Sequence, residues 1–70
     1  MVDEKALTQV LSDDPGDPAF IELADHMRRN DRYEEALLTC LKGLSANPSA
    51  HRGRLLLARL FFERGFWPSA

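Results

Sequence analysis

Two series of residues recur at an offset of 34 positions, and this spacing constrains the fold of the chain more than any other feature. The first series holds Leu23, Ala24, Met27, Tyr33 and Ala36, and the second holds Leu57, Ala58, Phe61, Trp67 and Ala70. A period of this length, with apolar residues three and four positions apart inside it, is typical of helix pairs that stack on one another. A generic bundle of three or four helices is the alternative, but it does not explain five matches at one offset. We therefore expect an all-α fold of antiparallel helix–turn–helix repeats.

Hydrophobic spacing and helix-ending residues predict about four helices, over residues 3–12, 18–30, 33–46 and 50–64. The last of these helices differs from the others, because its large apolar residues cover more than one stripe of its surface. These residues are Leu55, Leu56, Leu57, Leu60, Phe61 and Phe62. A helix that is apolar over most of its circumference requires partners on more than one side.

Composition excludes several classes of function. A chain of 70 residues forms at most one small domain, and its net charge of −2 gives no support to nucleic-acid binding. No stretch approaches the about 18 apolar residues of a membrane span. The single cysteine cannot form an internal disulfide, and the acidic N-terminus lacks the apolar segment of a signal peptide. We therefore expect a cytoplasmic protein that binds neither nucleic acid nor membranes.

No motif in the sequence supports catalysis or cofactor binding. His26 and His51 are isolated from each other, and Cys40 lies on the apolar stripe of the third helix, where a small buried residue is expected. There is no cysteine–histidine spacing suited to zinc and no glycine-rich phosphate loop. We therefore expect no enzyme activity, no catalytic residue, no metal and no cofactor.

The residue types within the repeat resemble the tetratricopeptide repeat family. The residues that carry the resemblance are Phe20, Leu23, Ala24, Tyr33, Ala36, Gly43 and Pro48. In this resemblance the small residue Ala36 lets the two helices of one unit approach closely, and Gly43 does the same for the neighbouring unit. The resemblance implies a capping helix and turn over 1–16, one full repeat over 17–50, and the first helix and turn of an incomplete repeat over 51–70. The chain then corresponds to an N-terminal fragment of a longer repeat protein.

The resemblance also implies a function, because family members bind peptides or helices on the concave face formed by the first helices of successive units. It therefore predicts a protein-interaction scaffold whose contact residues are Ile21, Asp25, Arg28, Arg52, Leu55, Arg59 and Phe62. Arg52 and Arg59 are seven residues apart, so they share one helix face and suit an acidic segment. The alternative is that these arginines only keep an apolar helix in solution. Ile21 and Asp25 replace the first two residues of the terminal-carboxylate clamp of some relatives, which argues against that activity.

The incomplete second copy leads to a different hypothesis, in which the chain associates with itself. A repeat unit buries its apolar face only against a neighbour, and a face left uncovered is an interface candidate. The residues assigned to such an interface are Leu57, Leu60, Phe61, Phe66 and Trp67. This hypothesis predicts a homo-oligomer with twofold symmetry. The two classes that remain are thus a module that binds a protein or peptide and a structural self-association element.

Overall fold

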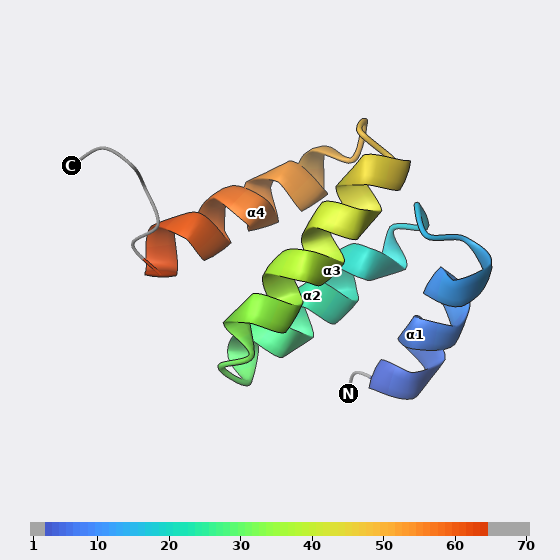
Figure 1. The fold of residues 1–70 in the computed structure, drawn as a ribbon, viewed down its shortest axis with the longest axis horizontal. Helices are drawn as coiled ribbons and strands as arrows, with labels where there is room; N and C mark the ends of the chain where they lie inside the picture. Colours follow the sequence, from blue (N-terminus) through green and yellow to red (C-terminus); the bar gives the residue numbers. More distant parts are fainter. Residues whose placement is uncertain (1–2, 65–70) are drawn as a thin grey trace.

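The computed structural model describes residues 3–64, apart from the Arg64 side chain. Over these residues the chain forms four α-helices and no strand: α1 (Glu4–Asp13), α2 (Ala19–Arg29), α3 (Tyr33–Ala46) and α4 (His51–Arg64) (Figure 1). The all-α prediction is confirmed, and each helix begins and ends within one residue of its expected range. Consecutive helices pack on each other, and α2 also contacts α4.

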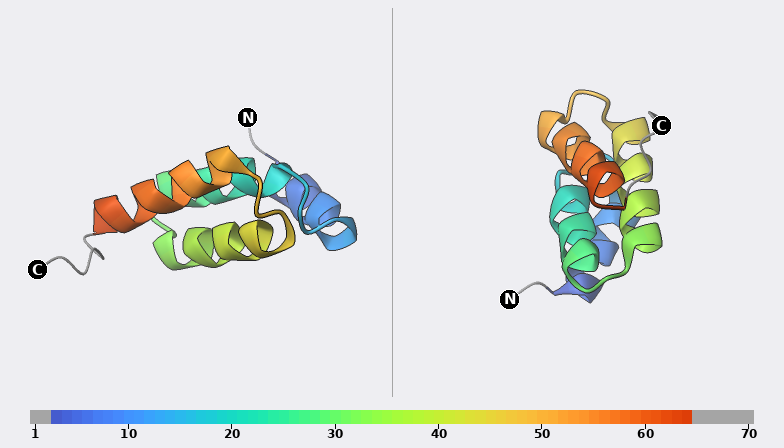
Figure 2. Two further views of the ribbon diagram at one scale, coloured as in Figure 1. Left: turned by 90° about the horizontal axis from the view of Figure 1, so that it is seen from above. Right: turned by 90° about the vertical axis from the view of Figure 1, so that its left-hand side faces the viewer.

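The helices after α1 form two layers. α2 and α4 run in the same general direction, side by side, and α3 lies across from both and runs the opposite way (Figures 1 and 2). Each pair of neighbours in the sequence is therefore an antiparallel hairpin. One face of the molecule is formed by α2 and α4 together, while α3 covers the other side of both helices.

The core is centred on the Phe20 ring of α2. The buried hydrophobic residues are Phe20, Leu23, Ala24, Met27, Ala36, Cys40, Leu56 and Leu60. A Cβ atom placed on Gly43 of α3 would lie 2.1 Å from Cγ of Phe20, and one on Gly53 of α4 would lie 2.6 Å from Cζ. The ring therefore lies between two glycines on different helices, because no larger residue leaves room for it.

Gly43 thus has a different role from the one expected. The family resemblance assigned it to contact with a neighbouring unit, but it packs against Phe20 within the same helix pair. Gly53 was not singled out from the sequence at all. Its carbonyl oxygen accepts a hydrogen bond from the buried Cys40 thiol at 3.2 Å, so it joins α3 to α4 as well as making room for the ring.

The turn between α2 and α3 is set by the conformation of Asp31. Its φ of 61° is in the left-handed region, which is more often occupied by glycine. The amide of Asp31 donates to the Arg28 carbonyl, and that of Arg32 donates to the Met27 carbonyl. This is the hydrogen-bond pattern of a Schellman motif, which ends α2 and sends the chain back along it.

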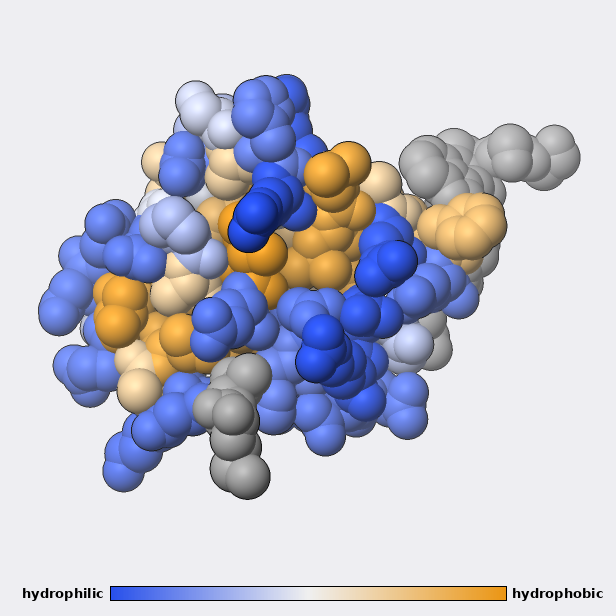
Figure 3. All heavy atoms as spheres, turned by 180° about the vertical axis from the view of Figure 1, so that it is seen from behind, coloured by the Kyte–Doolittle hydropathy of each residue, from blue (hydrophilic) through white to orange (hydrophobic). Residues whose placement is uncertain are grey.

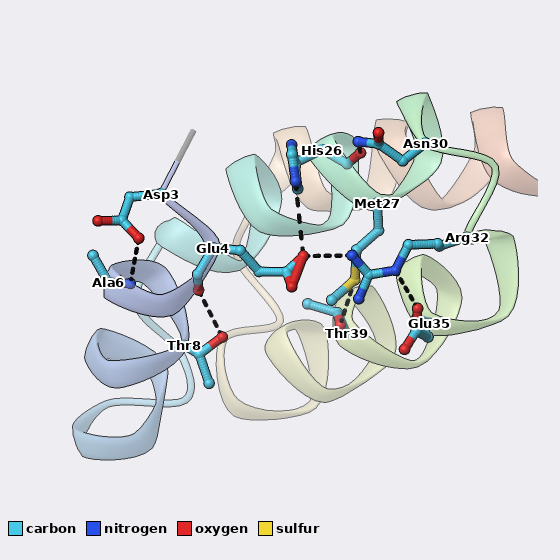
Figure 4. Close-up of polar contacts among 10 residues, drawn as sticks. All are labelled: Asp3, Glu4, Ala6, Thr8, His26, Met27, Asn30, Arg32, Glu35 and Thr39. Atoms are coloured by element: carbon cyan, nitrogen blue, oxygen red, sulfur yellow. Dashed lines mark hydrogen bonds and ion pairs between the residues drawn. The ribbon is translucent and has the colours of Figure 1, made fainter. Parts of the chain in front are cut away.

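α1 is held by polar contacts and by two partly buried leucines, Leu7 and Leu11, that pack against the core. Its first turn is capped by Asp3, whose carboxylate accepts from the Ala6 amide, and it contains no buried residue. Glu4 lies between His26, at 3.7 Å, and Arg32 (Figure 4), and Arg32 also pairs with Glu35. The hydrogen bond from Arg32 lowers the pKa of Glu35 below its ordinary value. These ion pairs tie the start of α1 to the α2–α3 turn.

Two structural features are absent from residues 3–64. None of the four helices is both long enough and apolar enough to cross a lipid bilayer. Among the same residues no cluster of three histidine, cysteine, aspartate or glutamate side chains has an arrangement that suits a metal ion.

Candidate functional site

A groove with a volume of about 850 Å³ runs between α2 and α4. Five of the seven predicted contact residues line it: Ile21, Asp25, Arg52, Leu55 and Arg59. They come together because α2 and α4 run in the same direction on one face, so equivalent positions of the two helices lie side by side. Figure 3 views the molecule from the side opposite to Figure 1 and so looks onto this face, where apolar side chains gather in the middle with hydrophilic side chains around them.

The apolar part of the groove is built from both helices. Leu55 of α4 is 70% exposed, and Ile21 of α2 is half-buried against the core. Leu56 also lines the groove but is 8% exposed, because most of its side chain is in the core. The groove therefore has an apolar surface that reaches solvent at Leu55.

On the α2 side the charge of Asp25 is already matched. Its carboxylate accepts from Arg28 at 2.8 Å and pairs with Arg29 at 3.0 Å. Arg28 reaches across to Glu63 of α4 at 3.2 Å, and its hydrogen bonds to Asp25 and Glu63 raise its pKa. Arg28 was predicted to contact a partner, but it does not line the groove. It instead connects α2 to α4 at the end of the groove.

The α4 side carries charges that are not matched within the described part of the chain. Arg52 and Arg59 are both exposed, and neither makes a hydrogen bond or ion pair through its side chain with any residue in 3–64. Seven residues of helix separate them by about 10.5 Å along one face. Both guanidinium groups are therefore available to a ligand that lies in the groove.

Glu22 is a groove residue that the sequence-based prediction missed. It is exposed on the α2 side and has no side-chain partner among residues 3–64. Its position three residues before Asp25 was the signal that it shares the same helix face. The nearby Asp17 is different, because its carboxylate accepts from the Ala19 amide at 2.9 Å and so serves the start of α2.

Phe62 continues the exposed face of α4 past the groove. It is 72% exposed and lies seven residues after Leu55, so the two side chains share a face of the helix. It is not part of the groove lining, which stops at Arg59. This placement extends the exposed apolar surface of α4 beyond the groove.

Three of the five residues assigned to self-association are described, and they are more buried than the expectation that they face water. Leu60 is 2% exposed and belongs to the core, so it is not accessible to a second chain. Leu57 and Phe61 are half-buried, and Leu57 packs against the core cluster. Phe66 and Trp67 lie outside the described residues. The positions of Leu56 and Leu60 on the inner side of α4 explain the error, since α3 and α2 already cover that side.

Comparisons with known proteins add no further constraint. No family model matches the chain, and no curated protein or solved structure is detectably similar to it. The tetratricopeptide resemblance therefore stays a prediction from the motif residues. Function has to be inferred from the groove and the side chains that line it.

Proposed function

We propose that this chain is a protein-interaction module of the helical-repeat type, which binds a segment of another protein in the groove between α2 and α4. The proposal joins the tetratricopeptide resemblance of the sequence to the geometry of the groove. The observation that carries it is an apolar groove surface, exposed at Leu55, between two arginines that have no partner among the described residues.

Elementary energetics support this use of the groove. Covering an exposed leucine is worth about 1.5–3 kcal/mol relative to leaving it in water. Charge-assisted hydrogen bonds from arginine to a carboxylate are stronger than neutral ones and fix the geometry of the ligand. Interfaces commonly combine an apolar centre with a polar rim, and the α2/α4 face has this arrangement.

Self-association is the competing function, and the pattern of exposure on α4 favours the groove. The two large apolar side chains of α4 with the highest exposure are Leu55 and Phe62, at 70% and 72%. Both belong to the predicted partner-binding face. Leu60, which was assigned to self-association, is instead part of the core.

A selection with a phage-displayed library of random peptides tests the proposal. The 70-residue chain is immobilised, and bound peptides are recovered and measured against Leu55→Asp by fluorescence anisotropy. Leu55 is so exposed that the substitution leaves the fold intact, which circular dichroism checks. The matched control is Leu38→Asp on α3, because Leu38 is also exposed, at 59%, and does not line the groove.

The proposal predicts peptides that lose at least tenfold in affinity on Leu55→Asp and none on Leu38→Asp. Failure to recover any peptide that depends on Leu55 would overturn it. Sedimentation velocity of the same chain tests the competing function. A stable dimer that Leu55→Asp leaves unchanged, together with no peptide that depends on Leu55, would favour self-association over peptide binding.

A further inference from the structure

The charges around the groove that lack a partner among the described residues have opposite signs on its two sides. Glu22 is on the α2 side, and Arg52 and Arg59 are on the α4 side. Asp25 adds no free charge, because Arg28 and Arg29 neutralise it. A ligand that fills the groove therefore meets two cations along one edge, the anions Asp17 and Glu22 along the other, and apolar side chains between them.

The spacing of the two arginines along α4 favours a helical ligand over an extended one. They are about 10.5 Å apart along α4. In a helix, residues seven positions apart have the same separation and point to the same side. In a strand, three residues span about 10 Å, but side chains three apart point to opposite faces, and an even spacing of four spans about 13 Å. A ligand helix lying along the groove thus fits both arginines at once.

The size of the groove agrees with a helix. A helical segment of seven residues is about 10.5 Å long and at least about 10 Å wide, which corresponds to a volume of about 800 Å³. The groove has a volume of about 850 Å³, and its lining lies between positions 17 and 25 on the α2 side and between positions 52 and 59 on α4. A ligand helix of two or more turns therefore finds matching length on both sides.

From these features we infer that the groove binds an amphipathic helix of a partner protein, with two acidic residues seven positions apart facing Arg52 and Arg59, a basic residue facing Glu22, and apolar residues against Ile21 and Leu55. This inference rests on the proposed function and specifies its ligand. The split of charge across the groove also fixes which edge of the helix faces α4, so the ligand binds in one rotational orientation.

The test uses the peptides recovered on the immobilised chain. The inference predicts that peptides whose binding depends on Leu55 carry acidic residues at a spacing of seven, and that their circular dichroism shows helix formation on binding. A synthetic copy of the best peptide is then titrated against Arg59→Glu and against Arg54→Glu. Arg54 is an exposed arginine on the same helix that does not line the groove, so its reversal makes the same change in net charge.

Arg59→Glu is expected to weaken binding about tenfold, because it replaces an attraction with a repulsion at the edge of an apolar contact. Arg54→Glu is expected to change the Kd less than twofold. A peptide in which lysine replaces the acidic residue opposite position 59 should recover the loss on Arg59→Glu and bind the unmodified chain more weakly. Raising the salt concentration should weaken binding of the original peptide to the unmodified chain.

The outcomes distinguish failure of the helical-ligand inference from failure of the proposed function. If peptides depend on Leu55 but lack paired acidic residues, bind in an extended form, or are insensitive to Arg59→Glu, the helical acidic ligand is wrong and the groove stands. If no peptide depends on Leu55, the groove itself is wrong. Equal losses on Arg59→Glu and Arg54→Glu would reduce the effect to net charge and would also overturn the inference.

Discussion

The two faces of α4 use similar residue types for different purposes. Leu56 and Leu60 point into the core and are 8% and 2% exposed, whereas Leu55 and Phe62 on the groove side are 70% and 72% exposed. Both faces are rich in large apolar side chains, so hydrophobicity alone does not separate them. The inner face is covered by α2 and α3, while no described residue covers Leu55 or Phe62. One face of α4 therefore holds the fold together, while its other face is left exposed.

Truncating a leucine on each face of α4 is expected to give the largest difference in stability between the two faces. Leu60→Ala is expected to cost about 2–5 kcal/mol of unfolding free energy, because it removes a buried side chain and leaves a cavity. That loss is a large part of the stability of a small domain. Leu55→Ala is expected to cost less than about 0.5 kcal/mol, since its side chain is mostly in water. Urea denaturation followed by circular dichroism measures both. Equal losses at the two positions would contradict the division of α4 into two faces.

The core beneath the inner face of α4 also depends on the space that Gly43 of α3 leaves for the Phe20 ring. Gly43→Ala is expected to destabilise the chain by a net of about 1–2 kcal/mol, since overpacking against the ring outweighs the gain in helix propensity. Ser45→Ala on the same helix is the control, because Ser45 is exposed. A double-mutant cycle with Phe20→Leu should show that a smaller side chain at position 20 recovers part of the loss. A stabilised Gly43→Ala variant would mean that the ring is not packed against α3.

Alkaline pH is expected to lower the free energy of unfolding and to leave peptide binding in the groove unchanged. Burial raises the pKa of the Cys40 thiol from its ordinary value of 9.0 to about 11. The unfolded chain therefore loses this proton first, so stability falls as the pH rises from about 9 to about 11. The expected loss at pH 10 is about 1 kcal/mol. It is measured by urea denaturation of the chain and of Cys40→Ala across this pH range, and a slope that persists in Cys40→Ala would assign it to other groups.

The smallest expected effect lies outside both faces of α4, in the α2–α3 turn. Asp31→Gly is expected to stabilise the fold by about 0.5 kcal/mol, because glycine adopts the left-handed conformation of position 31 without strain. Thermal unfolding measures the gain. Peptide affinity should not change, since the turn contributes nothing to the groove lining. A gain in stability accompanied by a loss of binding would show that the scaffold and the groove are coupled.

Much of the fold could be predicted from the sequence because its signals are local. Apolar spacing located all four helices, and the repeat offset indicated which of them pair. The helix predictions depend on periodicity, which short-range geometry fixes. The grouping of Ile21, Leu55 and Arg59 came from the family resemblance, in which the first helices of successive units form one face, and these three residues do line one groove.

The errors concern contacts between helices that periodicity does not specify. Leu60 was expected at an interface, but which stripe of an apolar helix is covered depends on where α2 and α3 lie. The ion pairs of Arg28 with Asp25 and with Glu63, 35 positions away in the sequence, were not predicted either. Gly53 gave no signal, because its role follows from the depth to which Phe20 reaches across the core.

The most direct test of the central claim is a nuclear magnetic resonance titration of the ¹⁵N-labelled chain with the best recovered peptide. The account predicts that amide shifts concentrate on α2 and α4 around Ile21, Leu55 and Arg59, while α1 and the exposed surface of α3 at Leu38 and Leu41 change little. Shifts concentrated on α3 or α1, with the groove residues unchanged, would contradict the assignment of the α2/α4 groove as the binding site.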